Sequence, residues 1–239
     1  MSVDVNRSER DKRWYGRRFG RKLSAARQRL VDELLPQLRV NPAADDGARN
    51  PVDWFDPSIS EIRMEIGFGA GEHLAGQAAA HPGVGFIGCE PFVNGVAALL
   101  DQINRQDLSN IRIFDDDVRL LLPSLPDGCL NRMDILFSDP WPKTRHHRRR
   151  ISDPGNLVQF ARLLAAGGEL RFATDQVEFA SWTLERMLRN TAFEWLARRP
   201  DDWTRAPTDW IETRYQQKAR ARGLGTTYLR FHRRRREDV

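Results

Sequence analysis

From about residue 62 onward, short apolar runs alternate with longer stretches of mixed polarity. The runs are rich in Ile, Val, Leu and Phe, which is typical of buried strands, and the intervening stretches place apolar residues at helical spacing. This alternation predicts a mostly parallel sheet with helices on both faces. The predicted strands are 62–66, 84–89, 111–114, 132–137 and 169–174, and the predicted helices lie near 71–80, 92–106, 118–122, 154–165 and 177–191.

The two ends of the chain follow different patterns. Residues 7–39 are expected to form a basic arm that leads into a helix, and residues 41–58 are rich in Asn, Asp, Pro and Gly, which favours a linker. Residues 226–231 are expected to add an antiparallel edge strand, followed by four arginines in a solvated tail. We therefore divide the chain into an arm, helix and linker (1–57) and an α/β domain (58–239).

The first predicted strand leads into a loop that contains Gly67, Gly69 and Gly71. Such a loop can turn tightly and lets a ligand approach the backbone. A dinucleotide-binding loop has a further glycine three residues after the second one, where this chain has Glu72, and a carboxylate there disfavours a pyrophosphate. The spacing therefore argues against NAD.

Two acids frame this loop. Glu65 precedes it directly, and Glu90 ends the next strand, 19 residues after Gly71. A ribose-binding acid lies roughly 20 residues beyond the glycine loop in Rossmann-type folds. Acids at these positions suit a ligand with an ammonium group and ribose hydroxyls but no phosphate, and S-adenosylmethionine fits that description. We expect Glu65 to face the methionine part or the loop backbone and Glu90 to bind the ribose, and the alternative is a structural turn.

An acid and a dense basic segment follow the fourth predicted strand. Asp139 lies just beyond the carboxyl end of that strand, where open α/β sheets bind ligands, and Pro140 and Pro142 stiffen the chain after it. Residues 143–150 then hold one lysine and four arginines. This arrangement predicts a reaction centre beside a phosphate-binding surface, and the alternative is an Asp-Pro turn with a solvated basic face.

Positive charge is concentrated in two segments. Residues 1–30 carry a net charge of +7 and residues 143–150 carry +5, whereas the whole chain has only +5. Such segregation is expected of a protein that binds a polyanion. No apolar run of 18 residues and no lipidation motif is present, which argues against a membrane partner.

The cysteines and the N-terminus bear on the compartment. Cys89 and Cys129 are the only cysteines, and no His/Cys cluster has metal-ligand spacing, so we expect reduced thiols and no metal site. The N-terminus has no apolar core of a signal peptide. We therefore expect a cytoplasmic protein.

Taken together, these motifs resemble those of the bacterial tRNA (guanine-N7)-methyltransferases. The resemblance extends from about Tyr15 to Phe231, and the Asp-Pro-Trp-Pro-Lys step with its basic segment is its most specific part. The matching motifs are Glu65–Gly71, Asp139–Lys143 with Arg145, His146 and Arg148–Arg150, Phe172–Asp175, and Thr213–Tyr215.

The resemblance implies a Rossmann-like class I methyltransferase fold that uses S-adenosylmethionine. It implies methylation of N7 of a guanosine in tRNA, at position 46 of the variable loop. Nothing visible in the sequence requires a protein partner, so we expect no obligatory one. Asp139 corresponds to the residue that the family treats as catalytic, at the place where cofactor and substrate meet. Substrate contacts are implied for Lys143, Asp175 and the second motif, which comprises Thr213, Arg214, Tyr215 and Gln216.

Two of these acids have competing roles. One of the three acids after the third strand is expected to meet the adenine amine, and the family pattern favours Asp117, with Asp116 as the fallback. Acids in this place also form helix N-caps and first turns. Asp175 is expected to select guanine through its N1–H and N2 amine, and the alternative is a cap of the helix that begins near Val177.

The chain departs from the family at Gln216, where an acid is usual. Gln keeps a carbonyl acceptor and loses the charge, so a contact to a base would be weaker. The alternative is that Arg214 and Tyr215 pack an insertion against the sheet. Two other classes of function stay open: a methyltransferase with another RNA or a protein as acceptor, and a tRNA-binding protein without catalysis, which only Gln216 supports.

The implied chemistry requires no base, because N7 of neutral guanine carries a lone pair and no proton. Positioning can contribute on the order of 7–11 kcal/mol, and a carboxylate can stabilise the positive charge that develops on the purine. We therefore expect Asp139 to orient and stabilise. The tRNA backbone is expected to contact the arginines at 145, 148, 149 and 150 and those at 13, 17, 18 and 21.

Overall fold

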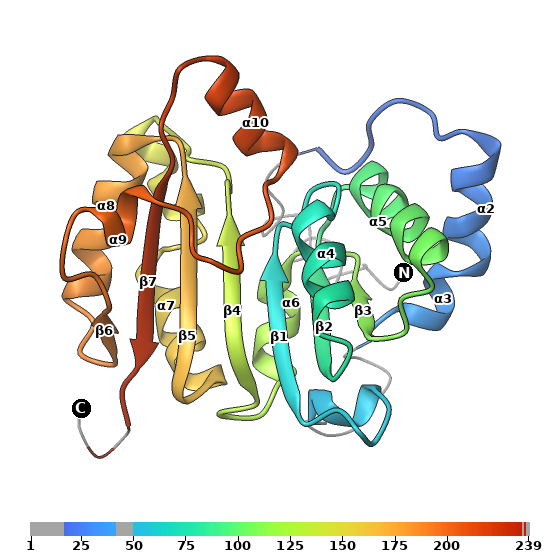
Figure 1. Ribbon diagram of the computed structural model, residues 1–239, viewed down its shortest axis with the longest axis horizontal. Coiled ribbons are helices and arrows are strands. Elements are labelled where there is room, and N and C mark those ends of the chain that lie inside the picture. Colours follow the sequence, from blue (N-terminus) through green and yellow to red (C-terminus); the bar gives the residue numbers. More distant parts are fainter. Residues whose placement is uncertain (1–16, 42–49, 236, 238–239) are drawn as a thin grey trace, which may run out of the picture.

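The computed structural model describes residues 17–41, 50–235 and 237. Within these residues, seven strands form one sheet in the order β3-β2-β1-β4-β5-β7-β6 (Figure 1). The strands are β1 (Glu61–Ile66), β2 (Val84–Cys89), β3 (Ile111–Phe114), β4 (Leu130–Leu136), β5 (Leu164–Thr174), β6 (Phe193–Trp195) and β7 (Thr227–Arg233).

The first five strands are parallel, and β7 runs antiparallel to β5. The predicted antiparallel edge is therefore confirmed, but its outermost strand is different. The prediction that residues 226–231 form the edge strand is wrong, because β6 pairs with the far side of β7. A three-residue strand with one buried side chain has too few apolar positions to stand out in a sequence.

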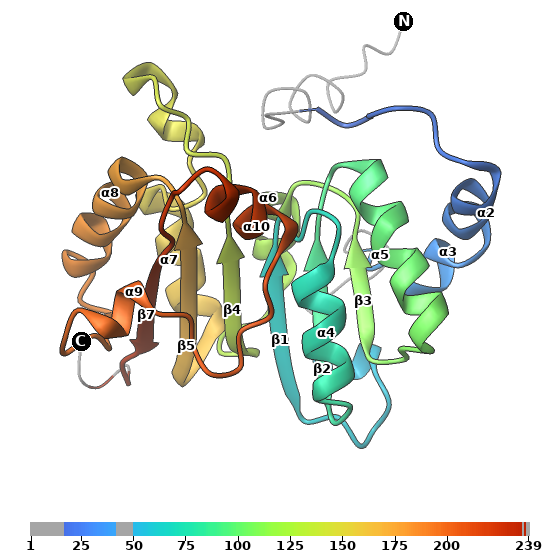
Figure 2. The same ribbon diagram turned by 45° about the horizontal axis from the view of Figure 1, so that its top comes forward.

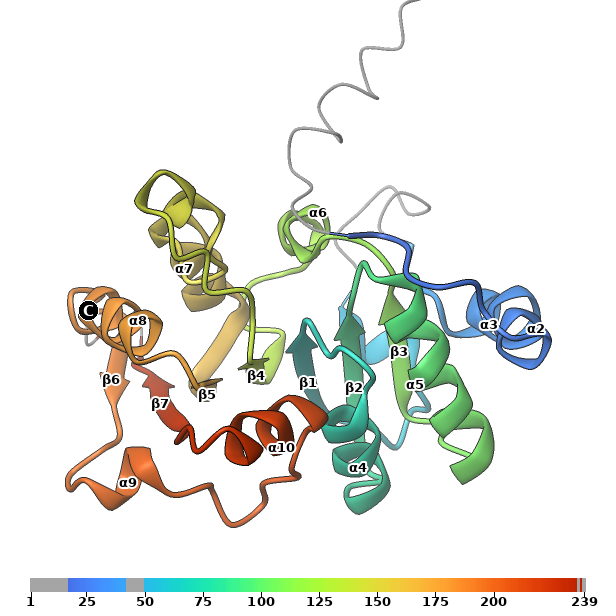
Figure 3. The ribbon, with the colours of Figure 1, turned by 90° about the horizontal axis from the view of Figure 1, so that it is seen from above.

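Helices cover both faces of the sheet. Figure 3 shows α4, α5, α9 and α10 on one side and α6 and α7 on the other. The helices are α2 (Ala25–Glu33), α3 (Leu35–Leu38), α4 (Glu72–Ala80), α5 (Val93–Gln106), α6 (Val118–Leu121), α7 (Pro154–Leu163), α8 (Val177–Leu188), α9 (Asp201–Thr204) and α10 (Arg214–Ala221). Short 3-10 helices lie at η2 (Pro51–Trp54), η3 (Leu122–Ser124) and η4 (Thr144–Arg149).

The central strands form where the apolar runs predict them because both of their faces are buried. All six residues of β2 are buried, and its bounds match the prediction. β5 begins five residues before its predicted start, because Gly167 and Gly168 interrupt the apolar pattern without ending the strand. A fully covered sheet has no solvent-facing side, so hydrophobicity marks whole strands and not alternate residues.

The N-terminal part packs against the sheet through α3. Leu35 and Leu38 belong to the same apolar cluster as residues of β2 and β3, and Arg39 forms a parallel bridge to Ile113. Ser24 caps α2 by accepting a hydrogen bond from the backbone N–H of Arg27. The division of the chain at residues 57 and 58 stays a prediction. The parts of the predicted arm and linker at 7–16 and 42–49 lie outside the described residues.

The C-terminal arginines do not all form a solvated tail. Arg233 lies in β7 and is buried, and its Nε donates to the carbonyl of Ala161. The prediction of a solvated tail is therefore wrong for Arg233, because β7 extends two residues beyond the predicted strand. Arg236 lies outside the described residues.

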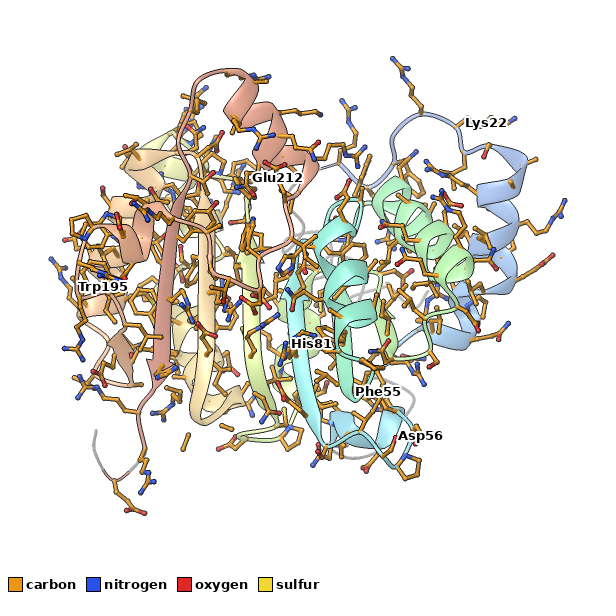
Figure 4. The ribbon with its side chains drawn as sticks, viewed as in Figure 1. Lys22, Phe55, Asp56, His81, Trp195 and Glu212 are labelled. Carbon is orange, nitrogen blue, oxygen red and sulfur yellow. The ribbon has the colours of Figure 1, made fainter. Side chains whose placement is uncertain are left out.

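The parallel strands all end at one edge of the sheet. Figure 4 shows Glu212 beside α10 at this edge, whereas His81, Phe55 and Asp56 lie at the opposite one. β1 is flanked by β2 and β4, so the strand order reverses next to it. The crevice beyond the carboxyl ends at such a reversal is where open α/β sheets bind ligands.

Candidate active site

A cavity of about 410 Å³ lies at this reversal. Its lining comes from the loops after four neighbouring strands and from α10: Gly67 and Gly69 after β1, Glu90 after β2, Asp117 after β3, Asp139 after β4, and Tyr215. The structure therefore brings together most of the side chains that the sequence singled out. Gly71 lies next to them as the N-cap of α4.

The glycine loop adopts a backbone that other residues rarely use. Gly67, Gly69 and Gly71 all have positive φ, at 73°, 60° and 80°. Gly95 of α5 packs so closely against the carbonyl oxygen of Gly69 that a Cβ atom would overlap it. The loop is therefore shaped both by its own glycines and by a glycine on the neighbouring helix.

Glu90 holds the glycine loop in place through its carboxylate. Its two carboxylate oxygens accept hydrogen bonds from the backbone N–H of Gly69 and of Phe92, each at 2.9 Å. The residue is only 8% exposed, and burial raises the pKa of its carboxyl above the usual value. Because a carboxylate has about four acceptor positions, Glu90 can also accept hydrogen bonds from a ligand in the cavity.

Glu65 takes a different position from the one expected. Its side chain lies on the α4 side of the sheet, and its Oε2 is 2.7 Å from Nδ1 of His73, both residues being buried. Burial lowers the pKa of His73, but the Glu65 carboxylate outweighs this effect and the pKa ends above its usual value. Glu65 does not line the cavity, so its role toward a cofactor stays a prediction.

The three acids after β3 have three different partners. Asp115 forms a two-point ion pair with Arg39, and Asp116 lies 3.7 Å from Arg18. Asp117 caps α6 through the N–H of Arg119, which confirms the capping interpretation, and it also lines the cavity. Of the three, only Asp117 belongs to the cavity wall, which favours it over Asp116 as the adenine contact.

Asp139 lies in a strained turn at the mouth of the cavity. Phe137 and Trp141, on either side of it, have φ values of 51° and 41°, in the left-handed region that non-glycine residues seldom occupy. Asp139 is exposed, but partial desolvation by the surrounding turn raises the pKa of its carboxyl. Such strain persists only where surrounding contacts hold it, and it is concentrated at functional sites.

The basic segment after Asp139 is only partly a surface. Lys143, which precedes η4, is exposed, as are Arg145 and Arg148 on η4. Arg149 packs over the Trp141 ring at 5.0 Å and lines the cavity. Arg150 is 0% exposed. The expectation that Arg150 contacts the tRNA backbone is therefore wrong, because its side chain is enclosed by protein. Arg13, expected on the same surface, lies outside the described residues.

Asp175 lies at the carboxyl end of β5, next to the strand that leads to Asp139. The N-cap of α8 is Gln176, and the side chain that serves the first turn is Thr174, whose Oγ1 accepts from the N–H of Gln176. Within the part of the chain that the structure describes, the Asp175 carboxylate has no hydrogen-bond or ion-pair partner. The capping alternative is therefore not supported, and the carboxylate is available to a substrate.

The second motif closes over the glycine loop. Thr213 caps α10 by accepting from the N–H of Gln216, and Arg214 forms an ion pair with Glu72 at 3.1 Å. The Tyr215 ring packs against Gly69 and separates the cavity from a wider hollow of about 590 Å³ over α5. Burial raises the pKa of the Tyr215 phenol, so it stays a hydrogen-bond donor.

Gln216 is held inside the fold. The indole N–H of Trp210 donates to its Oε1, and its Nε2 donates to the Tyr228 hydroxyl, both at 2.6 Å. A glutamate here could accept from both neighbours, because the tyrosine hydroxyl can turn and donate. Glutamine and glutamate at position 216 can therefore both bridge Trp210 and Tyr228.

Replacing Gln216 by glutamate tests this interpretation. We expect kcat/KM for the methylation of tRNA that the resemblance implies to stay within about threefold of the wild type, because the bridge survives. Replacing it by alanine removes both hydrogen bonds and leaves the Trp210 N–H without this acceptor, which should lower the free energy of unfolding by about 1–3 kcal/mol. Denaturant unfolding and steady-state kinetics provide both readouts. A gain of tenfold or more for Gln216→Glu, about 1.4 kcal/mol, would mean that an acid here grips the substrate.

Several residues of the site were not foreseen in the sequence. Phe137 and Ile151 form apolar parts of the cavity wall, and Arg17 reaches it from the segment that precedes α2. Arg17 was expected to contact only tRNA. Asp209 anchors the segment before the second motif through hydrogen bonds from Arg132 and Arg171, and nothing in its immediate sequence marks it. Such contacts arise from tertiary packing and have no local pattern.

None of the helices within 17–41, 50–235 and 237 combines the length and the apolarity that crossing a membrane requires.

Solved structures support the fold. The 16S rRNA methyltransferase KamB aligns with a TM-score of 0.55 and 12% identity, over 80% of this chain and 96% of that one. The antibiotic-resistance methyltransferase Kmr aligns with a TM-score of 0.53 and 18% identity, over 75% and 89%. At such low identity the likeness concerns the fold, which is that of the Rossmann-like class I methyltransferases.

Sequence relatives are much closer. The family model described as a putative methyltransferase matches residues 60–229. A tRNA (guanine-N(7)-)-methyltransferase of Rhodospirillum rubrum is 51% identical over 94% of this chain and 89% of its own length. One of Agrobacterium fabrum is 42% identical over 97% of this chain and 100% of its own length. With these relatives and the acids gathered around its glycine loop, this chain belongs to the tRNA (guanine-N7)-methyltransferase family.

Proposed function

We propose that the protein transfers a methyl group from S-adenosylmethionine to N7 of a guanosine in tRNA, at position 46 of the variable loop. The observation that carries the proposal is the gathering of Glu90, Asp117 and Asp139 around one cavity, beside an exposed basic segment. The family relationship supports the acceptor, and the position within tRNA rests on the resemblance alone. We expect the enzyme to act in the cytoplasm.

The cavity suits S-adenosylmethionine. Glu90 offers free acceptor positions for ribose hydroxyls, and Asp117, which lines the same cavity, can accept from the adenine amine. The loop at Gly67 and Gly69 lets a ligand lie against the backbone, and the carboxylate of Glu72 at the start of α4 disfavours a phosphate there. When bound, the cofactor supplies a methyl group on a sulfonium centre, which the unprotonated N7 of guanine can accept.

The residues of this chain act by orientation and charge. Asp139 and Asp175 lie at the ends of the adjacent strands β4 and β5, so a guanine between them would be within reach of both. The Asp175 carboxylate can accept from the N1–H and the N2 amine of guanine, and Asp139 can stabilise the positive charge that methylation creates. Neither role needs a proton to be removed.

Two basic segments flank the cavity. Figure 2 shows the yellow-green segment after β4 and the blue segment before α2 on either side of the upper edge of the sheet. Lys143, Arg145 and Arg148 are exposed on the first, and Arg17 and Arg21 on the second. Such residues hold a nucleic-acid backbone without reading its sequence. They would hold tRNA across the opening of the cavity.

Replacing Gly95 by alanine tests the cofactor site. The added methyl group meets the carbonyl oxygen of Gly69, so the glycine loop must move. We expect the dissociation constant for S-adenosylmethionine to rise at least about tenfold, or 1.4 kcal/mol, measured by calorimetry. Gly83→Ala is the matched control, because a Cβ atom there meets no other atom within 4 Å. Unchanged affinity of Gly95→Ala would place the cofactor away from this loop.

The function is tested by incubating the purified protein with unmodified tRNA and methyl-labelled S-adenosylmethionine. The RNA is then digested to nucleosides, and borohydride and aniline cleavage maps the site. Label in 7-methylguanosine at position 46 supports the whole proposal. Label in 7-methylguanosine at another position keeps the reaction and changes the site, and label in another nucleoside overturns the proposed chemistry. If tRNA and cofactor both bind and no nucleoside is labelled, the protein binds tRNA without methylating it.

A further inference from the structure

Arg150 is the last arginine of the basic segment, and in the sequence nothing separates it from Arg148 and Arg149. In the structure it is one of the largest fully buried side chains of the described residues. We infer that Arg150 is a positioning residue that holds the Asp139 turn against α8 and does not contact tRNA. The inference rests on the proposed function, because Asp139 is taken as the catalytic residue.

The first support is the set of hydrogen bonds that Arg150 makes to the turn. Its Nε donates to the carbonyl oxygen of Pro140 at 2.7 Å, and its Nη2 lies 3.5 Å from the carbonyl oxygen of Trp141. These are the two residues that follow Asp139 directly. Trp141 is one of the strained positions, with φ at 41°. The guanidinium therefore supports the turn where it departs most from an ordinary backbone.

The second support is the way α8 holds the other side of the guanidinium. Nη2 and Nη1 donate to the two carboxylate oxygens of Glu178, at 2.6 and 3.2 Å. The guanidinium carbon also lies 5.2 Å from the ring centre of Phe179 and 4.7 Å from that of Trp182. Ion pairing in a fork geometry and stacking on aromatic rings are contacts that arginine makes and lysine does not reproduce.

The third support is the placement of α8 itself. This helix begins two residues after Asp175, and β5, which carries Asp175, lies next to β4, which carries Asp139. Arg150 therefore connects the turn of the proposed catalytic acid to the helix that follows the proposed guanine-binding acid. A side chain in that place sets the spacing between Asp139 and Asp175. Misplacing a reacting group by about 1 Å can cost roughly 100-fold in rate.

The two possible roles of Arg150, stabilising the fold only or positioning the Asp139 turn, lead to different kinetics in a variant. The variant Arg150→Lys keeps the charge and loses the fork. We expect kcat at saturating tRNA and cofactor to fall at least about tenfold. The Kd for tRNA and the dependence of log Kd on log salt concentration should stay as in the wild type, since the side chain is not exposed. Arg148→Gln is the contrast: its tRNA affinity should fall, and the salt slope should decrease by roughly 0.7–0.9.

Arg189→Lys is the matched control, because the same substitution is made on an exposed side chain at the end of α8, paired with Glu185. It should leave kcat and KM unchanged. Hydrogen exchange of the backbone at residues 138–150 should be faster in Arg150→Lys than in either the wild type or this control. This readout does not depend on methylation. A wild type that forms no 7-methylguanosine would refute the proposed function, while exchange would still test the anchoring.

Three results would overturn the inference. Wild-type kcat in Arg150→Lys would mean that the fork is not needed. Loss of tRNA affinity with an unchanged kcat would make Arg150 an RNA contact after all. If Arg150→Lys does not fold, Glu178→Gln removes the charge of the exposed partner and leaves the arginine in place. We then expect kcat to fall about three- to tenfold with tRNA affinity retained, because the turn that carries Asp139 is held less firmly, and an unchanged kcat would overturn the inference.

Discussion

Replacing Asp139 by alanine or asparagine is expected to lower kcat for tRNA methylation by about 10²- to 10³-fold, the usual cost of removing a group that stabilises transition-state charge. Asparagine keeps the shape of the side chain and removes the charge, so an equal loss in both variants would assign the effect to the charge. The Kd for tRNA should change by less than about threefold, because the basic segments carry most of that affinity. Equal losses of turnover and of tRNA affinity would contradict this assignment.

Because the pKa of Asp139 is raised, we also expect kcat to depend on pH. Partial desolvation raises the pKa of this carboxyl, so kcat should fall as the pH drops through the raised pKa. The acid limb should be absent in Asp139→Asn. The effect on folding stability has the opposite pH dependence. The folded state binds the proton of Asp139 more tightly than the unfolded state does, so the ionised carboxylate lowers the free energy of unfolding above the ordinary pKa. At pH 7, Asp139→Asn should therefore be at least as stable as the wild type, as measured by thermal unfolding.

The order of the site residues could be predicted because parallel strands end at one edge. Gly67, Glu90, Asp117 and Asp139 each follow a separate apolar run, and the structure gathers them around one cavity. The chemistry of the residues alone could not show which acid after β3 belongs to the cavity, since Asp115, Asp116 and Asp117 are alike, and only the family pattern favoured Asp117. Their partners come from elements far away in the sequence, and only the fold brings those elements together.

The direction of the Glu65 side chain and the exposure of the arginines in the basic segment also depend on the fold and could not be predicted. Glu65 precedes the glycine loop, but side chains alternate along a strand, and this one faces α4 and His73. Arg148, Arg149 and Arg150 are adjacent, yet one is exposed, one packs on Trp141 and one is buried. Charge composition predicts a phosphate-binding surface, whereas burial decides which of its members can belong to that surface.

Asp209 shows how a residue without any local signal can hold a site together. It precedes the second motif, and one of its carboxylate oxygens accepts hydrogen bonds from both Arg132 of β4 and Arg171 of β5, each at 2.9 Å. Its backbone carbonyl accepts from Nε2 of Gln77 on α4 at 2.5 Å. One residue therefore ties the chain before Thr213 to two strands and a helix.

Replacing Asp209 by alanine is expected to lower the free energy of unfolding by about 2–4 kcal/mol. Removing one partner of a buried charge pair costs about 3–5 kcal/mol, but Arg132 and Arg171 keep Asp134 and Glu169 as partners, so the loss should be somewhat smaller. Burial alone would raise the pKa of Asp209, and the two arginines outweigh it, so its pKa is lowered. This contribution is therefore present above the unfolded-state pKa and disappears as the pH falls through the folded-state value.

Denaturant unfolding of Asp209→Ala and Asp209→Asn at pH 7 and at low pH measures both the loss of stability and its dependence on pH. Asparagine keeps a neutral acceptor and should recover some of the loss, and the difference between wild type and Asp209→Ala should shrink in acid. Because Asp209 leads directly to Trp210 and Thr213, the variant should also bind tRNA more weakly at a temperature where it is still folded. A variant with wild-type stability would show that Arg132 and Arg171 are satisfied by Asp134 and Glu169 alone. The segment before α10 would then depend on Trp210 and Gln77 for its position.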